Sequence, residues 1–382
     1  MKQHLCASII AATAALAPAG AGAAELIYGS FVPPKHGVNV YGLEPMFETL
    51  KPDVEWRLVP GGQLFSGAAT LKSVGGGVAD AGLVVTSFTR SELKNSYLIA
   101  DLIMLGEDGM AMNAAAMETI MLDCPECKTD YTESNTVFLA GYSFDGYALL
   151  CRNENVDSVE AVKGLKIRTT GALGRWAKAL DAVPVNMGSG EMPEALQRGQ
   201  LDCAMGPVAW LTAYPIEDVI KSIYLYDYGA LGGIGAFVMN KDAWSGLDES
   251  QRAAMWKELP NLSARIVVDA YEGDTLRALK RAEELGIKVS RRGDDVTKAW
   301  EKHVKDELLT VVKDGEELGV ANAQTVVDTM VENLDKWRNL VAEAGLPDLV
   351  ANSDADNLEE ARNIYADLLR EHIYSKIDPN AY

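Results

Sequence analysis

The sequence lacks the short motifs that identify several large classes of enzyme. It contains no G-x-S-x-G nucleophile turn, no H-E-x-x-H zinc pair, no G-x-x-x-x-G-K-[ST] phosphate loop and no G-x-G-x-x-G after a predicted strand. The glycines at 75–77 resemble a phosphate loop only in composition, because they end a helical pattern, where glycine commonly terminates the helix. These absences disfavour hydrolase, zinc-protease and nucleotide-dependent chemistry.

Positive charge is also scarce. The chain has 35 Lys and Arg residues against 55 Asp and Glu residues, which gives a formal net charge of −20 at pH 7. This balance opposes binding to nucleic acid and to an anionic membrane surface, because both carry negative charge. A cationic side chain in a ligand site would therefore be a local exception in an acidic protein.

Long hydrophobic runs are absent except at the N-terminus. Residues 5–16 are uncharged and mostly apolar, Lys2 precedes them, and Ala21-Gly22-Ala23 fits the A-x-A cleavage pattern. The run is shorter than the roughly 20 residues that span a bilayer. We therefore expect residues 1–23 to be a signal peptide that is removed near Ala23, so that the mature chain is exported.

Few cysteines remain after that cleavage: Cys124, Cys127, Cys151 and Cys203. An even number in an exported protein permits two disulfides, and four cysteines allow three pairings that the sequence alone does not distinguish. We predict Cys124–Cys127 together with Cys151–Cys203. Redox chemistry or zinc binding is the alternative for the C-x-x-C, but no strand leads into it and no histidine follows at zinc-finger spacing.

Strand and helix patterns alternate in two successive sets. The first set has expected strands at 25–33, 54–60, 80–85 and 137–143, with helices at 36–50, 64–75 and 109–124. The second set has expected strands at 147–152, 165–168, 183–187, 201–205 and 222–226, with helices at 173–180 and 191–198. Such alternation implies two α/β lobes with parallel sheets that helices cover.

The last third of the chain is mostly helical and charged. A further strand is expected at 235–240, a helix from about Leu247, a brief strand at 287–290, and long helices at 295–315, 321–344 and 357–375. We expect lobe I to comprise 24–146 plus 234–275, lobe II to comprise 147–233, and a C-terminal helical region, 276–382, to pack across both lobes.

One arginine in the second set is the main candidate for a ligand contact. Arg168 ends an apolar strand and precedes Thr169-Thr170-Gly171, a turn that leads into a helix. Arginine binds a carboxylate through two parallel hydrogen bonds, and the strand ends of a two-lobed α/β protein face its ligand cleft. The alternative is a solvated arginine at the surface. We expect nearby Arg175 at the surface.

The segment 163–207 resembles the solute-binding receptors of tripartite ATP-independent periplasmic (TRAP) transporters, in their dicarboxylate-receptor-like family. The resemblance rests on KIR at 166–168, LDAVPVNM at 180–187 and ALQRGQLD at 195–202, with support from PGGQL at 60–64, GVAD at 77–80 and MNKDAW at 239–244. It extends over essentially the whole mature chain, although only the central block is specific.

The resemblance implies a two-lobe periplasmic binding protein fold, with two parallel-type sheets flanked by helices, hinge strands and long C-terminal helices. It implies a receptor with no catalytic activity and no cofactor, in which Arg168 pairs with a ligand carboxylate. The implied partners are a small-molecule carboxylate and the small and large membrane subunits of a TRAP transporter, driven by an ion gradient.

Two departures from the family pattern bear on the ligand. Gly206 stands before Pro207 where family members often carry asparagine, and residues 144–148 lack the second arginine of sialic-acid receptors. These departures leave fewer fixed polar groups in the site and space at Gly206 and Ala148. They favour a monocarboxylate with an apolar or aromatic body as the ligand, and next a C4-dicarboxylate. The aromatic residues expected near the cleft, each more often a core residue when taken alone, are Phe65, Phe144, Tyr147 and Trp210.

His36 and Asn186 are further candidates. The resemblance puts His36 at the mouth of the cleft, and the alternative is a solvated histidine at a helix start; Asn186 flanks the loop after a strand. Two other functions stay open. One is a ligand-presenting sensor subunit for a membrane kinase, and the other is a periplasmic enzyme on the same fold that uses Asp145 and His36 as acid and base.

Overall fold

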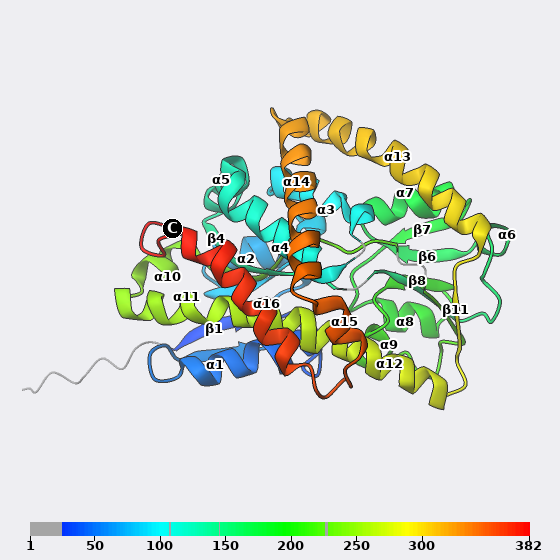
Figure 1. Ribbon diagram of the computed structural model, residues 1–382, viewed down its shortest axis with the longest axis horizontal. Coiled ribbons are helices and arrows are strands. Elements are labelled where there is room, and N and C mark those ends of the chain that lie inside the picture. The colour runs from blue at the N-terminus through cyan, green and yellow to red at the C-terminus, as the bar shows by residue number, and fades with distance from the viewer. Residues whose placement is uncertain (1–24, 107, 145, 226–227) are drawn as a thin grey trace, which may run out of the picture.

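The computed structural model describes residues 25–382 apart from 107, 145 and 226–227. The predicted signal peptide, 1–23, and Asp145 lie outside the described residues. Two lobes lie side by side, each built on one sheet (Figure 1). In the part of the chain that is described, no helix is both long and apolar enough to cross a membrane.

Lobe I contains a five-stranded sheet in the order β2-β1-β3-β10-β4. Its strands are β1 (Leu26–Gly29), β2 (Trp56–Val59), β3 (Ala81–Val84), β4 (Thr136–Tyr142) and β10 (Ile234–Asn240). Its helices include η1 (Val38–Leu43), α1 (Glu44–Leu50), α2 (Thr70–Gly75), α3 (Lys94–Asp101), α4 (Gly109–Glu118), α5 (Pro125–Glu133) and α10 (Lys241–Gly246). The strands β4 and β10 are buried along their whole length, so helices cover both faces of this sheet.

Lobe II contains a six-stranded sheet in the order β11-β9-β5-β8-β6-β7. Its strands are β5 (Ala148–Cys151), β6 (Lys166–Thr169), β7 (Val183–Asn186), β8 (Cys203–Gly206), β9 (Ser222–Leu225) and β11 (Lys288–Arg291). Its helices are α6 (Val159–Val162), α7 (Ala172–Ala179), α8 (Met192–Gln197) and α9 (Trp210–Ala213). The two-lobe α/β fold predicted from the sequence is confirmed.

The alternation of strands and helices predicts parallel sheets, but neither sheet is wholly parallel. In lobe I, β10 runs antiparallel to β3 and β4, and in lobe II, β5 runs antiparallel to β8 and β9. Both reversed strands follow a crossing between the lobes, β4 to β5 and β9 to β10, with no helix between them in the described part of the chain. Since a parallel connection needs a crossover element, a strand that arrives directly from the other lobe enters its sheet in the reverse direction.

A long helical segment also connects the lobes. α11 (Glu249–Ala264), η6 (Arg265–Glu272) and α12 (Gly273–Glu284) follow one another without a break and run from lobe I to lobe II (Figure 1). Ala278 and Ala282 of α12 pack into the core of lobe II, and β11 then joins its sheet. The expected C-terminal helical region, 276–382, therefore differs from the structure in that its first part belongs to lobe II.

The last helices fasten the lobes together. α13 (Asp294–Glu317) extends from lobe II towards lobe I above both sheets, and α14 (Ala323–Glu343) packs on α4 and α3 (Figure 1). α15 (Leu346–Ala351) leads to α16 (Glu359–His372), which packs on α11. The helices α14 and α16 thus pack against the helices of lobe I.

The two disulfides join the pairs predicted from the sequence. Cys124–Cys127 spans the start of α5, with 5.2 Å between the Cα atoms. Cys151–Cys203 links β5 to β8, where the two residues are direct partners across the ladder and their Cα atoms lie 4.1 Å apart. All four sulfur-bearing side chains are buried, which supports a structural role for the C-x-x-C.

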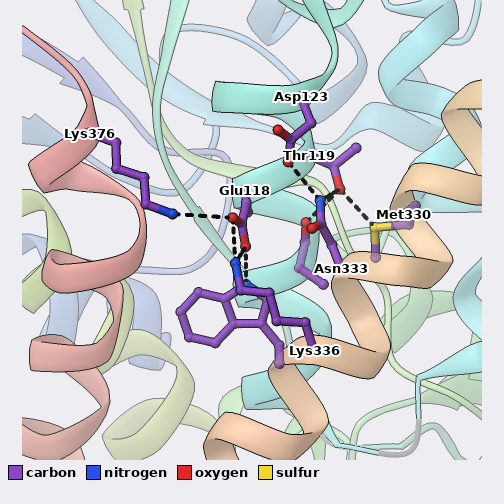
Figure 2. A network of polar contacts seen from close by, with 9 residues as sticks. Glu118, Thr119, Asp123, Met330, Asn333, Lys336 and Lys376 are labelled. Carbon is purple, nitrogen blue, oxygen red and sulfur yellow. Dashed lines mark hydrogen bonds and ion pairs between the residues drawn. The ribbon is translucent and has the colours of Figure 1, made fainter.

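A buried carboxylate anchors α14 to α4. The Glu118 side chain is 6% exposed, and Lys336 Nζ lies 2.6 and 2.5 Å from its two oxygens. Trp337 Nε1 donates to Glu118 Oε2 at 2.7 Å, and Lys376 Nζ lies 3.7 Å from Oε1 (Figure 2). Glu118 thus holds two C-terminal segments, one through the hydrogen bonds of Lys336 and Trp337 and the other through the ion pair with Lys376.

Replacing Glu118 with alanine should lower the free energy of unfolding by about 2 kcal/mol, because the buried Trp337 N–H loses its acceptor and Lys336 its counter-ion. Urea denaturation of the two proteins measures this. The exposed ion pair Lys313–Glu317 provides a control, since Lys313→Ala should change stability by under about 0.5 kcal/mol. Equal effects of the two substitutions would contradict the anchoring role.

Candidate functional site

A cavity with about 40 Å³ of free space lies between the lobes. Lobe I and the hinge segments contribute Phe31, Val32, His36, Val85, Phe88, Tyr142, Phe144, Leu231, Ile234 and Tyr271 to its wall. Lobe II contributes Tyr147, Arg168, Thr170, Ser189, Trp210 and Tyr214. Since both lobes line it, a molecule held here contacts both lobes at once.

Arg168 is fixed inside this cavity by the strands beside its own. It lies on β6, between β7 and β8, and is 3% exposed. Its Nε donates to the Met187 carbonyl at 3.0 Å, and its Nη1 donates to the Met205 carbonyl at 3.2 Å. Its guanidinium carbon lies 5.0 Å from the ring centroid of Trp210. These contacts use two of its five donors and hold the guanidinium plane in place.

The charge of Arg168 meets no acidic side chain among the described residues. Burial lowers the pKa of Arg168, and the nearby Tyr147 and Tyr214 partly oppose that shift. An arginine stays protonated even so. No carboxylate of the described residues forms an ion pair with Arg168, and its hydrogen bonds go to two backbone carbonyls. A buried cation without a counter-ion is unfavourable, so the site favours an anion.

The rest of the wall is uncharged and mostly aromatic, with aliphatic and hydroxyl side chains between the rings. Tyr142 and Tyr271 stack at 5.6 Å, while Phe144 lies 5.0 Å from Tyr147 and 5.2 Å from Tyr271 between ring centroids. Burial raises the pKa of Tyr147 to about 12, so its hydroxyl is neutral at pH 7. Among the lining residues Arg168 is the sole Lys or Arg. A ligand in the cavity therefore meets mostly apolar surface, together with neutral hydroxyl groups.

His36 lies inside the cavity rather than at its mouth or in solvent. It is 3% exposed, and its Nδ1 accepts the backbone N–H of Val38 at 3.3 Å. Its ring lies edge-on to Tyr214 at 5.8 Å and to Tyr271 at 6.2 Å. Burial lowers the pKa of His36 to about 4, so the ring is neutral at pH 7.

With this geometry established, comparison with known proteins gives the family. Residues 43–314 match the bacterial extracellular solute-binding protein family 7. The chain belongs to this family. The match extends over most of the chain, and it confirms the resemblance that the motifs around Arg168 carry.

Individual relatives of this family 7 protein are distant. The C4-dicarboxylate-binding periplasmic protein DctP of Rhodobacter capsulatus is 26% identical over 180 residues, which are 46% of this chain and 52% of that protein. The matched region thus spans about half the length of that relative. The family assignment therefore rests on the family match and not on a close relative.

Two solved structures share the fold over their whole length. A TRAP periplasmic solute-binding protein from Bordetella bronchiseptica with bound (R)-mandelate and (S)-mandelate has a TM-score of 0.70 at 20% identity, covering 82% of this chain and 99% of that one. A TRAP solute-binding protein from Rhodoferax ferrireducens with copurified benzoate has a TM-score of 0.73 at 17% identity, covering 83% and 99%. They establish the two-lobe architecture of this family 7 protein.

The space expected at Gly206 is filled in the structure. A Cβ atom at Gly206 would lie 2.2 Å from Cε3 of Trp210, so the missing side chain makes room for the indole and not for a ligand. Ala148 pairs with Gly206 across β5 and β8 and packs in the lobe II core. The interpretation of an enlarged pocket at these two residues was wrong, because Trp210 itself occupies the space and forms part of the wall.

Two other expected residues do not line the cavity. The ring of Phe65 covers Gly29, within 2.2 Å of where a Cβ would stand, and packs with Val74 and Ala79 in a small core cluster. Asn186 is exposed at the end of β7 and lines an outer groove of about 470 Å³. Arg168, His36, Trp210, Tyr147 and Phe144 are the predicted residues that the structure brings together.

Several wall residues were not predicted. Phe31 and Phe88 closely follow the ends of β1 and β3. Side chains near the carboxyl end of a strand face the ligand cleft, and this rule, which pointed to Arg168, could also have found these two residues. Tyr214 and Tyr271 follow no such rule, because they lie after a short helix and within η6. Only the packing of η6 across both lobes brings Tyr271 to the cavity.

Lowering the pH should destabilise the ligand-free protein through His36. The folded pKa is about 4 and the unfolded value about 6.5, so the unfolded state binds the proton first. This contribution to stability, about 3 kcal/mol, is fully present above pH 6.5 and is lost as the pH falls through 4. Urea denaturation between pH 7 and 4.5 should therefore show a steeper loss for wild type than for His36→Gln. Parallel losses would show that His36 is not buried neutral.

Proposed function

We propose that this protein is the solute receptor of a TRAP transporter and captures a monocarboxylate with an apolar or aromatic body. The ligand lies in the cavity between the lobes, with its carboxylate on Arg168. The observation that carries this proposal is a buried arginine without a carboxylate partner among the described residues, set in a wall of aromatic rings.

The composition of the wall favours one carboxylate over two. A second carboxylate would lie among neutral tyrosine hydroxyls and a neutral His36, with no second Lys or Arg in the lining. Burying an unpaired charge is unfavourable, whereas burying an aromatic ring against Trp210, Phe144 and Tyr271 is favourable. A C4-dicarboxylate, which the Rhodobacter capsulatus relative is named for, is therefore the less suited ligand.

Membership of the family supports delivery of the ligand to the membrane. We infer that the signal peptide at 1–23 directs the chain to the periplasm, with cleavage near Ala23, and that the closed, ligand-loaded lobes are presented to the small and large membrane subunits. A ligand that contacts both lobes stabilises the closed arrangement through its differential affinity for it. Loss of acid uptake from cells that lack this protein, at unchanged levels of the membrane subunits, would support transport; unchanged uptake would favour the sensor function.

A thermal-shift screen tests the ligand class. The panel contains benzoate, phenylacetate and mandelate, the diacids succinate and malate, and benzamide as a neutral analogue. A ligand at about 100 times its Kd adds about 2.7 kcal/mol to the stability of the folded state, a clear shift. We expect shifts with the aromatic monocarboxylates and none with benzamide. Shifts confined to the diacids would overturn the monocarboxylate assignment, and no shift with any acid would overturn the role of Arg168.

A further inference from the structure

We propose that the ligand carries a hydroxyl or carbonyl group on its apolar body, remote from the carboxylate, and that His36 recognises this group through its Nε2–H. The inference rests on the proposed function and deepens it, because it names a second polar contact at the same site. It makes His36 the residue that separates substituted from unsubstituted acids.

The hydrogen bonding of His36 decides which ring nitrogen carries the proton. Nδ1 accepts the N–H of Val38 at 3.3 Å, so in the neutral ring the proton is on Nε2. The low pKa that burial gives His36 keeps the ring in this neutral form. His36 thus offers one fixed donor and no charge, which suits an uncharged acceptor and not a carboxylate.

Among the described residues, no protein group accepts a hydrogen bond from this donor. The hydrogen bonds of the described residues include a partner for Nδ1 of His36 and none for Nε2, although the residue is almost completely buried. Nε2 is not fully enclosed by protein, so a ligand oxygen in the cavity can accept its hydrogen bond in place of water. The ring makes edge contacts with Tyr214 and Tyr271, two other residues of the cavity wall.

His36 and Arg168 are separated along the cavity wall by two aromatic rings. Arg168 stands over Trp210 at 5.0 Å, Trp210 lies 5.5 Å from Tyr214, and Tyr214 lies 5.8 Å from His36. Arg168, Trp210 and Tyr214 belong to lobe II, whereas His36 comes from the turn before η1 in lobe I. A ligand that reaches both donors bridges the lobes, with its body against these rings.

The other hydroxyls nearby are already engaged. Tyr214 donates its hydroxyl to Ser189 Oγ at 2.8 Å, and the hydroxyls of Tyr142 and Tyr271 interact with each other. Their remaining capacity is mainly for accepting hydrogen bonds. A ligand hydroxyl can therefore accept from His36 and donate to a tyrosine oxygen, whereas a plain hydrocarbon edge leaves the donor of His36 unpaired.

Matched pairs of acids test the assignment by calorimetric titration. Phenylacetate is compared with 3-hydroxyphenylacetate and 4-hydroxyphenylacetate, in wild type and in His36→Phe, which keeps a ring and removes the donor. At least one ring hydroxyl should improve the affinity of wild type about tenfold over phenylacetate, and His36→Phe should abolish that gain, measured as the ratio of the two affinities within each protein. Mandelate, whose hydroxyl is next to its carboxylate, should gain nothing from His36.

The outcomes separate the two proposals. A hydroxyl gain that survives in His36→Phe, or equal weakening of every acid by that substitution, overturns the role of His36 and leaves Arg168 as the carboxylate site. Failure of all the acids to bind wild type overturns the proposed function and this inference with it. If circular dichroism shows that His36→Phe does not fold, His36→Gln is used instead. Its amide keeps a donor, so we expect a partial gain in affinity from the ring hydroxyl. If the ring hydroxyl gives wild type no gain in affinity, the assignment is overturned whichever variant is used.

Discussion

Replacing Arg168 with alanine should weaken binding of the carboxylate ligand about a thousandfold, or about 4 kcal/mol. The guanidinium is buried, and both neighbouring strands hold it through the Met187 and Met205 carbonyls, so its remaining donors face the cavity without rearrangement. A carboxylate in that position gains a charge-assisted pair of hydrogen bonds in surroundings that exclude water. Calorimetric titration with the best acid of the panel measures the loss.

Two further variants sharpen this test. Arg168→Lys keeps the charge but loses the planar fork, so we expect an intermediate loss of about ten- to a hundredfold. Arg198, at the C-terminal end of α8, is exposed and pairs with neighbouring Glu194, so Arg198→Ala should bind as wild type does. Because no carboxylate of the described residues pairs with Arg168, the ligand-free Arg168→Ala protein should keep its stability within about 1 kcal/mol. An affinity for Arg168→Ala within threefold of wild type would contradict the carboxylate role.

Replacing Arg175 with methionine should lower the free energy of unfolding by about 4 kcal/mol at pH 7. Arg175 lies on α7 in lobe II, and its Nη2 lies 2.7 Å from Oδ2 of Asp101 on α3 in lobe I. It also pairs with Glu307 on α13. The side chains of Asp101 and Glu307 are 1% and 3% exposed. Without the arginine, two buried carboxylates lose their counter-ion.

The pH dependence of this effect distinguishes charge from packing. Burial raises the pKa of Asp101 and of Glu307, and Arg175 opposes that rise. In Arg175→Met the positive charge that opposes this rise is gone, so the pKa values of both carboxyls in the folded state rise further above their unfolded values. As the pH falls, the folded state therefore binds protons before the unfolded state does. The loss should therefore shrink between pH 7 and pH 5. Arg198→Met is the control, with an expected change under about 0.5 kcal/mol; a loss independent of pH would point to packing alone.

Arg168 and Arg175 show what the sequence can and cannot predict. Arg168 was identified because its place at the end of a strand, before a glycine turn, is a local pattern. Arg175 was expected at the surface, since nothing within one turn of its helix pairs with it. Its partners, Asp101 and Glu307, lie 74 and 132 residues away, and only the packing of both lobes against α13 brings them together.

The remaining differences have the same physical origin. The alternation of strands and helices predicted the two lobes. The direction of β5 and β10 depends on where the chain crosses between the lobes, and local hydrophobic periodicity does not show this crossing. Gly206 was interpreted as free space, because the sequence does not show that the Trp210 ring lies against it. His36 was placed at the mouth, although its burial between Tyr214 and Tyr271 depends on residues from both lobes.

A crystal structure with the tightest-binding acid of the panel tests the central claim most directly. We expect the ligand carboxylate within hydrogen-bonding distance of the Arg168 guanidinium and the ligand body among Trp210, Phe144 and Tyr271, inside the cavity between the lobes. A carboxylate bound away from Arg168, or a ligand in the outer groove beside Asn186 with the cavity unchanged, would contradict it.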